Sequence, residues 1–394
     1  MKVFIAGIDG YLGWPLAQYL TQRGHTVAGA DLLLRREWVA EIGSISAIPI
    51  ASRDERVAAF ARQYGLSLDF RVGDLTDYAF VTAALADFQP DAIVHLGQMP
   101  SAPYSMIDQQ HAVWTQTNNI TSNLNLLWAM REVCPQAHLV KLGTMGEYGT
   151  PNIDIPEGFF EVEFRGRKDR LPFPRQAGSF YHQAKVHDSH NTAFASKIWG
   201  LAATDIMQGV VFGSRWVGMP DDARLRTRYD FDQCFGTAVN RFVAQAVINH
   251  PLTLYGVGFQ KRGYLPLSDS LQCVSLIIEN PPQPGEYRVI NQFEETYTVT
   301  ELACMVRDVA EELGMQPQVH HYDNPRTELE EHYYHPDRQT LIELGYQPNH
   351  DVRGELRRMI PDVHQFRDRI AQYADILIPD IRWDGTRRRS QLLD

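Results

Sequence analysis

Three glycines near the start of the chain constrain its fold more than any other feature of the sequence. Gly7, Gly10 and Gly13 follow an apolar run at residues 3–6 and precede a helical segment that begins at Pro15. Glycines at this spacing let the backbone turn tightly between a strand and a helix and approach a phosphate closely. The start of the helix adds free N–H groups and the positive end of a dipole. We therefore predict a dinucleotide-binding turn formed by Gly7, Gly10, Tyr11, Leu12 and Gly13.

Short apolar runs alternate with helical stretches through the first half of the chain. The expected strands lie at 3–6, 26–30, 68–72, 92–96, 139–142 and 202–208, and the expected helices at 15–22, 78–87, 113–131 and 186–197. This alternation is typical of an α/β fold with a doubly wound parallel sheet of the Rossmann type. We predict a dinucleotide-binding domain over residues 1–210, with a substrate loop at 151–178. A smaller C-terminal α/β lobe, residues 211–394, is expected to bind mainly the substrate and to return segments to the main sheet.

The overall composition limits the classes of ligand and the compartment. The 394 residues carry a formal net charge of −11, which argues against a nucleic-acid-binding protein. Four widely spaced cysteines show neither metal-ligand spacing nor a disulfide framework, so we expect no metal. No apolar run reaches the length of a membrane span, and the first strand leaves no room for a signal peptide. We expect a cytoplasmic protein whose basic run at residues 387–389 is a solvated tail.

Asp31 indicates which dinucleotide is bound. It ends the second expected strand, eighteen residues after Gly13, where an acidic side chain accepts hydrogen bonds from the adenosine ribose. A 2′-phosphate would meet its charge, so NAD is favoured over NADP, although Arg35 and Arg36 are placed to stack on adenine or to meet a phosphate. Asp74 either contacts the adenine amino group or caps a helix, a role that Thr76 fits equally well. The other expected cofactor contacts are Leu75, Leu96, Asn118, Tyr181, Lys185, Gln208 and Val211.

A tyrosine and a lysine four residues apart indicate the chemistry. Tyr181 and Lys185 share one face of an expected helix, about one turn apart. Free tyrosine has a pKa of about 10, and a neighbouring ammonium group favours the phenolate. Tyr181 is then able to take a proton from a substrate hydroxyl while a hydride leaves for NAD. Thr144, directly after an expected strand, is positioned to hydrogen-bond the same oxygen, so we predict an enzyme that oxidises and re-reduces a bound alcohol.

These motifs together resemble the extended short-chain dehydrogenase/reductase family. The shared residues are the glycine triplet, Asp31, Thr144, Tyr181 and Lys185, with Asn119 where that family has a helix-bending asparagine. Longer strings at residues 101–108, 141–155 and 179–191 resemble the UDP-sulfoquinovose synthases within it. The resemblance implies oxidation of UDP-glucose at C4 by NAD, elimination across C5 and C6, addition of sulfite at C6 and reduction at C4, as in sulfolipid biosynthesis. It also implies a homodimer formed through the helices at 113–131 and 186–197.

The proton transfers at C5 and C6 require residues other than those of ordinary relatives. The 4,6-dehydratases of this family place Asp-Glu directly after the threonine, whereas Met145 and Gly146 stand there in this chain. Glu147 and His182 are therefore the candidates for removing the C5 proton and protonating the leaving hydroxyl. Each also has a structural interpretation, as a buried hydrogen-bond acceptor and as a packed helix residue.

The UDP part of such a substrate requires cations and a slot for uracil. Arg262 and Arg326 are the expected phosphate ligands. The other expected substrate contacts are Ser101, Thr144, Gly146, Glu147, Asn191, Gln208, Arg241, Tyr255, Gln260 and Glu330. Gln98-Met99-Pro100 stands where the family often has Glu-Gln-Arg, which leaves open a sister UDP-sugar dehydratase or 4-epimerase that does not use sulfite. A non-catalytic nucleotide-sugar sensor is disfavoured because Tyr181 and Lys185 are both kept.

Overall fold

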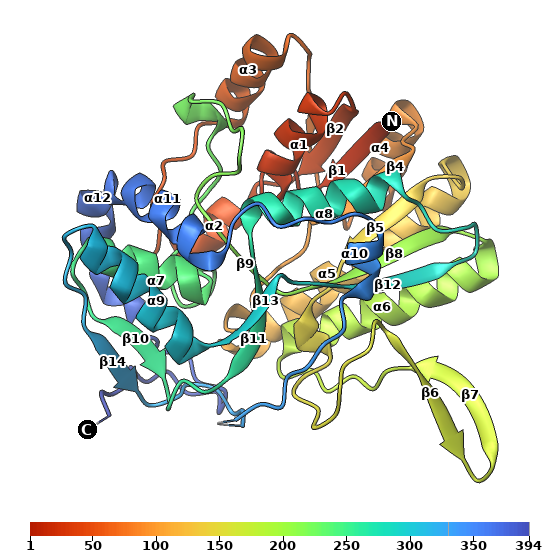
Figure 1. The fold of residues 1–394 in the computed structure, drawn as a ribbon. Coiled ribbons are helices and arrows are strands. Elements are labelled where there is room, and N and C mark those ends of the chain that lie inside the picture. The colour runs from red at the N-terminus through yellow and green to blue at the C-terminus, as the bar shows by residue number, and fades with distance from the viewer. Residues whose placement is uncertain (330, 394) are drawn as a thin grey trace.

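A seven-stranded parallel sheet forms the centre of the computed structural model, which describes residues 1–329 and 331–393 (Figure 1). Its strand order is β12-β8-β5-β4-β1-β2-β3, and every neighbouring pair runs parallel. The strands are β1 (Lys2–Ala6), β2 (Thr26–Asp31), β3 (Asp69–Val72), β4 (Ala92–His95), β5 (His138–Leu142), β8 (Ala202–Gln208) and β12 (Tyr287–Gln292). The order runs outward in both directions from β1, which confirms the predicted doubly wound α/β fold.

Helices cover both faces of this sheet because apolar side chains alternate along its strands. Val3 and Ile5 point to one face, where residues of α1 (Gly13–Gln22), α3 (Arg53–Tyr64) and α8 (Leu267–Glu279) pack. Phe4 and Ala6 point to the other face, which α4 (Tyr78–Phe88), α5 (Gln109–Val133) and α6 (Phe180–Trp199) cover. The turns at the carboxyl ends of the strands are thereby left to form a ligand site.

A separate hydrophobic cluster holds the C-terminal lobe together. It combines α7 (Ala238–Val247), α9 (Val299–Glu312), α11 (Val352–His364) and β10 (Leu252–Tyr255). The shorter elements of the second half are β9 (Val210–Phe212), β11 (Lys261–Pro266), β13 (Glu295–Thr298), β14 (Val319–Tyr322), α10 (Gln339–Glu343) and α12 (Arg367–Ala371). β12 returns to the main sheet beside β8, as expected from the sequence.

Two segments contain regular structure that the sequence did not predict. Within residues 151–178, β6 (Phe159–Phe164) and β7 (Arg167–Pro172) pair as an antiparallel hairpin that projects from the body of the molecule (Figure 1). Its turn residues, Arg165 and Gly166, both have positive φ, as a two-residue hairpin turn requires. Between β2 and β3 the chain also forms α2 (Leu34–Glu41) and α3, the latter with a capping box from Ser52 to Glu55. The prediction of an irregular loop was therefore wrong for the middle of 151–178.

The end of the chain is ordered by ion pairs. Arg387, Arg388 and Arg389 are each about half exposed and pair with Asp380, Asp323 and Asp375 respectively. The basic run is thus solvated, as expected, but it is also fastened to the lobe. In the described part of the chain, no helix is both long and apolar enough to cross a membrane.

Candidate active site

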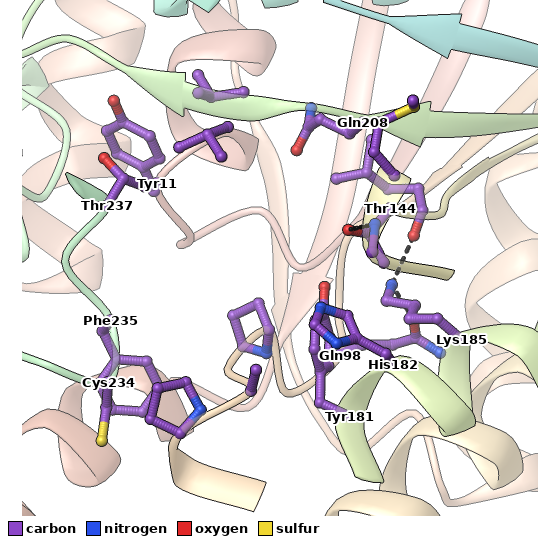
Figure 2. A pocket seen from close by; sticks show the side chains of 18 of the residues that line it. Tyr11, Gln98, Thr144, Tyr181, His182, Lys185, Gln208, Cys234, Phe235 and Thr237 are labelled. Carbon is purple, nitrogen blue, oxygen red and sulfur yellow. Dashed lines mark hydrogen bonds between the residues drawn. The ribbon is translucent and has the colours of Figure 1, made fainter. Parts of the chain in front are cut away.

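A cavity of about 630 Å³ lies at the carboxyl edge of the sheet, between the sheet and the C-terminal lobe (Figure 2). The turns that follow β1, β2, β4, β5 and β8 form one wall, and residues of α7, β11 and the segment after β14 form the other. The predicted site residues that line it are Gly7, Gly10, Tyr11, Leu12, Gly13, Asp31, Arg35, Asp74, Leu75, Leu96, Asn118, Thr144, Gly146, Tyr181, His182, Lys185, Gln208, Val211, Arg241, Tyr255, Gln260, Arg262 and Arg326. Residues far apart in the sequence therefore meet in one place.

The glycine turn is packed so tightly that larger residues do not fit. Gly7 has a φ of 91°, and a Cβ on it would lie 2.5 Å from the backbone nitrogen of Gly97. A Cβ on Gly13 would lie 2.1 Å from the carbonyl oxygen of Gly7. The following helix, α1, has neither a side-chain cap nor an acidic residue in its first turn, so its positive end faces the cavity unneutralised. The turn and helix start fit the pyrophosphate of a dinucleotide.

The two arginines that follow Asp31, Arg35 and Arg36, are each paired with a carboxylate. Arg36 donates two hydrogen bonds to Asp9, each of 2.8 Å, and does not line the cavity, which corrects its assignment as a cofactor contact. Arg35 lines the cavity but pairs with Asp230 at 2.8 Å. Asp31 accepts hydrogen bonds from the backbone N–H groups of Asp9 and Leu33, and burial raises its pKa to about 6. The guanidinium groups that a 2′-phosphate would need are therefore already neutralised by carboxylates. This arrangement favours NAD over NADP.

Asp74 lines the cavity and does not cap a helix. Its carboxylate accepts a hydrogen bond from the backbone of Thr76, whereas α4 is capped by Asp77, which accepts from Ala79 and Phe80. Neither Asp74 nor Thr76 is therefore the N-cap, and the position of Asp74 is compatible with a contact to adenine.

Thr144, Tyr181 and Lys185 converge on one side of the cavity (Figure 2). α6 begins at Phe180 because the Ser179 side chain caps it by accepting from the His182 backbone. This start places Tyr181 and Lys185 on one face of the helix, with the lysine Nζ 6.0 Å from the centre of the tyrosine ring. Thr144 follows β5 and its hydroxyl accepts a hydrogen bond from Gly146.

Burial sets the proton affinities of this pair. It lowers the pKa of Lys185, with a further contribution from the nearby Lys141 ammonium. Burial also raises the pKa of the Tyr181 hydroxyl well above its ordinary value, and the Glu147 carboxylate adds to this effect. The phenolate thus depends on positive charge brought close to it.

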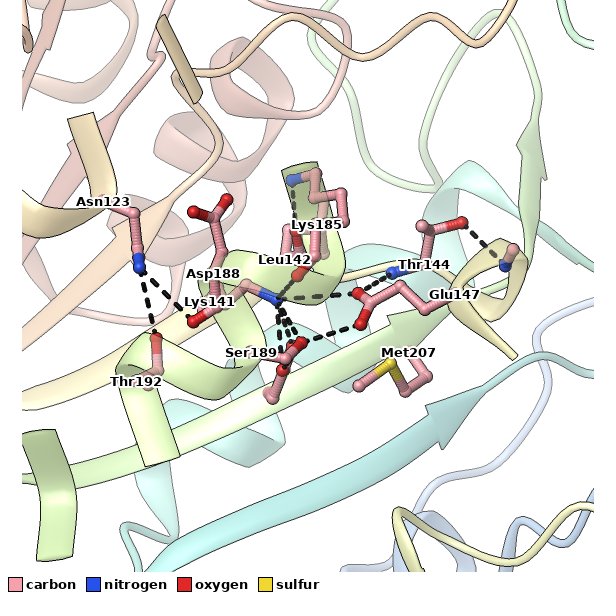
Figure 3. A network of polar contacts seen from close by, with 12 residues as sticks. Asn123, Lys141, Leu142, Thr144, Glu147, Lys185, Asp188, Ser189, Thr192 and Met207 are labelled. Carbon is pink, nitrogen blue, oxygen red and sulfur yellow. Dashed lines mark hydrogen bonds and ion pairs between the residues drawn. The ribbon is translucent and has the colours of Figure 1, made fainter. Parts of the chain in front are cut away.

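Glu147 lies under the cavity wall and does not line the cavity (Figure 3). It is fully buried, and its carboxylate faces Lys141 at 3.6 Å and Arg175 at 3.3 Å. Ser189 donates to it at 2.8 Å, and the Thr144 backbone N–H donates to it at 3.3 Å. Two cations and a capping interaction thus hold this carboxylate behind Thr144 and away from the cavity in which the expected substrate contact would lie.

Lys141 lies at the centre of that buried network of hydrogen bonds and ion pairs. Its ammonium bonds both carboxylate oxygens of Asp205, at 3.0 and 3.1 Å, and the hydroxyl of Ser189. Tyr287 donates to Asp205 at 2.7 Å. The one sign of this network in the sequence is a lysine inside an otherwise apolar strand, because the partners of Lys141 come from β8 and α6, far along the chain.

His182 faces the cavity as a neutral imidazole. Its Nδ1 lies 3.0 Å from the Ser179 hydroxyl, and its Nε2 packs against Gly146, where a Cβ would lie only 2.4 Å away. Burial, followed by the charges of Arg326 and Arg262, lowers the pKa of His182 to about 3. Of the two acid–base candidates, His182 is the one that reaches the cavity.

The far end of the cavity gathers long polar side chains from the C-terminal lobe. Arg241 is buried, stacks 4.5 Å from the centre of the Tyr255 ring and donates to the Thr253 carbonyl. Arg262 pairs with Glu328 at 2.7 Å, while Arg326 lies over the Trp383 ring. Four buried polar atoms here have no hydrogen-bond partner among the described residues: Thr237 Oγ1, Arg241 Nε, Tyr255 Oη and Gln260 Oε1. Donors and acceptors of this kind fit a nucleotide.

Besides Glu147, three predicted substrate residues are not among those described as lining the cavity. Ser101 is buried and its hydroxyl donates to the Cys234 carbonyl at 2.6 Å, so it fastens two loops together. Asn191 shares a helix stripe with Phe194 and Ile198, which are exposed on the outer face of α6. The third, Glu330, lies outside the described residues.

Several lining residues were not among those predicted for the site. Trp383 comes from the C-terminal segment and donates to the Gly178 carbonyl at 2.8 Å. Cys234 and Phe235 line the opposite wall, where Arg35 stacks 3.8 Å from the centre of the Phe235 ring. Phe235 opens a string at residues 235–238 that matches the family, but neither Trp383 nor Cys234 stands in a motif, and the tertiary fold brings all three to the site.

Comparison with known proteins identifies the family. Residues 3–291 match the NAD dependent epimerase/dehydratase family. The chain is 45% identical over 384 residues to the UDP-sulfoquinovose synthase of Sulfolobus acidocaldarius, covering 97% of this chain and 98% of that protein. It is 46% identical over 382 residues to the chloroplastic UDP-sulfoquinovose synthase of Spinacia oleracea, covering 97% of this chain and 79% of that protein. This chain belongs to the UDP-sulfoquinovose synthases of that family.

The solved structure of the UDP-glucose 4-epimerase of Thermus thermophilus, a complex with NAD, has the same fold. Its TM-score is 0.65 at 21% identity, over 93% of this chain and 99% of that one. As in other members of this NAD-dependent family, the cofactor of this synthase is NAD. The Gly7–Gly13 turn, Asp31 and the neutralised Arg35 and Arg36 fit that cofactor.

Proposed function

We propose that this chain converts UDP-glucose and sulfite to UDP-sulfoquinovose and water. The observation that carries the proposal is the convergence of Thr144, Tyr181, Lys185 and His182 in one cavity whose far end is lined by arginines. The overall reaction replaces the 6-hydroxyl by a sulfonate and leaves C4 at its original oxidation level. NAD, when bound, accepts a hydride from C4 and returns it at the end of the cycle.

Tyr181 moves the proton on the 4-oxygen. As its phenolate it takes the hydroxyl proton during oxidation, and it gives the proton back during the final reduction. The Lys185 ammonium stabilises the phenolate, which burial alone disfavours. The Thr144 hydroxyl, held by the turn that Glu147 caps, supports the same substrate oxygen. Glu147 therefore acts on the reaction through the position of Thr144.

His182 moves the protons at C5 and C6. The 4-ketone acidifies the C5 proton; a neutral imidazole takes it, and the resulting imidazolium protonates the 6-hydroxyl as it leaves as water. Sulfite then forms a C–S bond at C6 of the alkene, and C5 regains a proton. A bound pyrophosphate offsets the charges of Arg262 and Arg326, which together with burial lower the pKa of His182. Substrate binding thus makes this imidazole a better base.

The C-terminal lobe holds the UDP group. Arg262 and Arg326 bind the pyrophosphate, and Gln260, Tyr255 and Arg241 supply unpartnered polar atoms for the uridine. We also propose the functional division near residue 210, with the cofactor held mainly before it and the nucleotide sugar mainly after it.

The test is incubation of the purified protein with UDP-glucose, with and without sulfite, followed by mass spectrometry. A sulfonated UDP-hexose that appears only with sulfite supports the proposal. Turnover of UDP-glucose that ignores sulfite contradicts it and favours a dehydratase or 4-epimerase. His182→Gln separates the steps: we expect it to reduce the cofactor with UDP-glucose but to form no sulfonated product.

We propose that two copies associate through the outer faces of α5 and α6. Leu124 and Trp128 on α5 are 36% and 42% exposed, and Phe194 and Ile198 on α6 are 63% and 47% exposed. The two residues on each helix are one helical turn apart. The four side chains therefore form two exposed apolar stripes, one on each helix, of the kind that marks an interface. Phe194→Glu is expected to yield a monomer in light scattering, whereas Phe164→Glu, in the projecting hairpin, is expected to leave the dimer intact.

A further inference from the structure

We propose that Gln98 is a positioning residue that holds the Lys185 ammonium by a neutral oxygen and keeps the Asp188 carboxylate apart from it. This inference rests on the proposed redox role of Tyr181 and Lys185. It gives the uncharged residue at this position a function of its own, separate from any contact with the sugar.

The hydrogen bonds of Gln98 fix its orientation. Its amide nitrogen donates to the Asp188 carboxylate at 2.6 Å and to the Asn119 carbonyl at 2.9 Å. Both partners are acceptors, so the amide oxygen must point the other way, where it accepts from Lys185 Nζ at 2.5 Å. The Gln98 side chain is 6% exposed, and every polar group of its amide is used.

Lys185 is therefore held by two carbonyl oxygens, those of Gln98 and the Leu142 backbone, each at 2.5 Å. Among the described residues, no carboxylate oxygen lies within ion-pairing distance of its ammonium. Burial and the nearby Lys141 cation make the charge of this ammonium costly to keep. Its direct side-chain and backbone ligands among the described residues are neutral, and the carboxylates of Asp188, Glu147 and Asp205 offset the cost only through longer-range charge. The amide of Gln98 thus separates Lys185 from the carboxylate that would otherwise bind it.

The charged and titratable groups around Lys185 come from five elements. Asp188 lies one turn further along α6, and Tyr181 one turn before it on the same helix. Lys141 of β5, Glu147 of the turn after β5 and Asp205 of β8 act on it through their charges. His95, at the end of β4, is buried and loses affinity for a proton partly because of Lys185. None of these groups hydrogen-bonds the ammonium; its side-chain partner among the described residues is Gln98, from the loop after β4.

The consequence is that the pKa of Lys185, which burial and the Lys141 charge lower, depends on the ligands of its ammonium. Activity requires the ammonium, because it stabilises the Tyr181 phenolate, so activity is lost as the pH rises through the pKa of Lys185. A neutral ligand leaves that pKa low, whereas a carboxylate in its place would raise it. Gln98 then sets the position of the alkaline limb of the pH–activity profile.

Two substitutions of opposite character test this. Gln98→Glu puts a carboxylate against Lys185, and Asp188 takes up a proton to accommodate it; we expect the alkaline limb to move upward by about one pH unit or more. Gln98→Met fills nearly the same space and so still keeps Asp188 apart from Lys185, but it removes the oxygen ligand without adding charge, and we expect the limb to move downward. The measurement is the pH dependence of cofactor reduction by UDP-glucose, followed by NADH absorbance. Gln318→Glu, exposed at the start of β14, is the matched control and is expected to keep the wild-type profile.

The outcomes distinguish the inference from the proposal beneath it. A wild-type protein that never reduces its cofactor with UDP-glucose contradicts the proposed function. An active wild type whose alkaline limb is unchanged in Gln98→Glu, or displaced in the same direction by both substitutions, overturns the role of Gln98. Thermal unfolding of each variant shows whether the fold is kept. A simple loss of packing would not move the alkaline limb of the pH–activity profile in opposite directions in the two variants.

Discussion

The two ends of the cavity recognise their ligands by different means. At the dinucleotide end, contacts come from the backbone of one short turn and from Asp31, whose two carboxylate oxygens already accept hydrogen bonds from N–H groups. At the UDP end, long side chains arrive from α7, β11, the segment after β14 and the C-terminal segment. The first end is built by local sequence, and the second only by the tertiary fold.

This difference has an energetic side. The glycine turn is so close-packed that a change there strains the backbone of β1 and α1, which belong to the central core. The polar side chains of the UDP end are not part of the lobe core, and the buried polar atoms of Arg241, Tyr255 and Gln260 include ones with no partner among the described residues. Variants at the dinucleotide end should therefore affect stability and cofactor together, and variants at the UDP end should affect the substrate alone.

The largest effect is expected where the two ends meet. Tyr181→Phe removes one hydroxyl and no packing, so both ligands should still bind while the proton transfer at the 4-oxygen is lost. We expect cofactor reduction to slow by about 10²–10⁴-fold, with UDP-glucose affinity within a few-fold of wild type. Stopped-flow absorbance and calorimetry measure the two quantities. Near-normal reduction would remove Tyr181 from the mechanism, and Tyr78→Phe, on the exposed start of α4, is the control.

The next effect tests the coupling of stability and cofactor at the dinucleotide end. In Gly13→Ala the new Cβ would lie 2.1 Å from the Gly7 carbonyl oxygen, so the turn must move away from the pyrophosphate. We expect at least about a tenfold loss of NAD affinity, with a fall in the unfolding midpoint of several degrees. Gly24→Ala is the control, because its Cβ meets nothing and only its φ of 83° is strained. It should lower stability and keep NAD affinity; a loss of affinity there would break the comparison.

A third variant tests the UDP end by itself. Arg326 has no carboxylate partner among the described ion pairs, so Arg326→Met leaves no buried charge unpaired. Loss of a charge-assisted contact is worth about 1.5–3 kcal/mol, which corresponds to about a 10- to 150-fold weaker affinity for UDP-glucose. NAD affinity and the unfolding midpoint should not change. A substrate affinity equal to that of Arg62→Met, an exposed control on α3, would exclude Arg326 from the site.

The same contrast explains what the sequence predicted. The expected strands of the sheet domain agree with the structure to within one residue at each end, because periodicity and glycine spacing are local signals. In contrast, α6 begins six residues before its expected range, and α2 and α3 were not predicted. Asn191 and Arg36 do not line the cavity, since Asn191 shares a helix stripe with exposed residues of α6 and Arg36 pairs with Asp9. Trp383 and Lys141 had no assigned role, since their partners are distant in sequence. Glu147 was recognised as important, but its surroundings place it behind Thr144.

The smallest effect separates a histidine of the site from one of the core. Burial lowers the pKa of both His182 and His138 to about 3, while an unfolded histidine titrates near 6.5. Because the unfolded chain binds the extra protons, stability falls as the pH drops below about 6.5 and stops falling near 3. Each histidine contributes a slope of up to about 1.4 kcal/mol per pH unit within that window.

Bound UDP-glucose should change only one of these two contributions. It offsets the arginines beside His182 and so reduces that slope, whereas His138 packs in the sheet against Thr204, away from the cavity. Denaturant unfolding at several pH values between 4.5 and 6.5, about two pH units inside the window, measures the slope of the unfolding free energy against pH. His138→Gln should flatten it with or without substrate, and His182→Gln should flatten it only without substrate. If UDP-glucose leaves the contribution of His182 to the slope unchanged, the arginines do not couple substrate binding to this imidazole. His364→Gln is the control, because His364 lies at the end of α11, outside both the cavity and the central sheet.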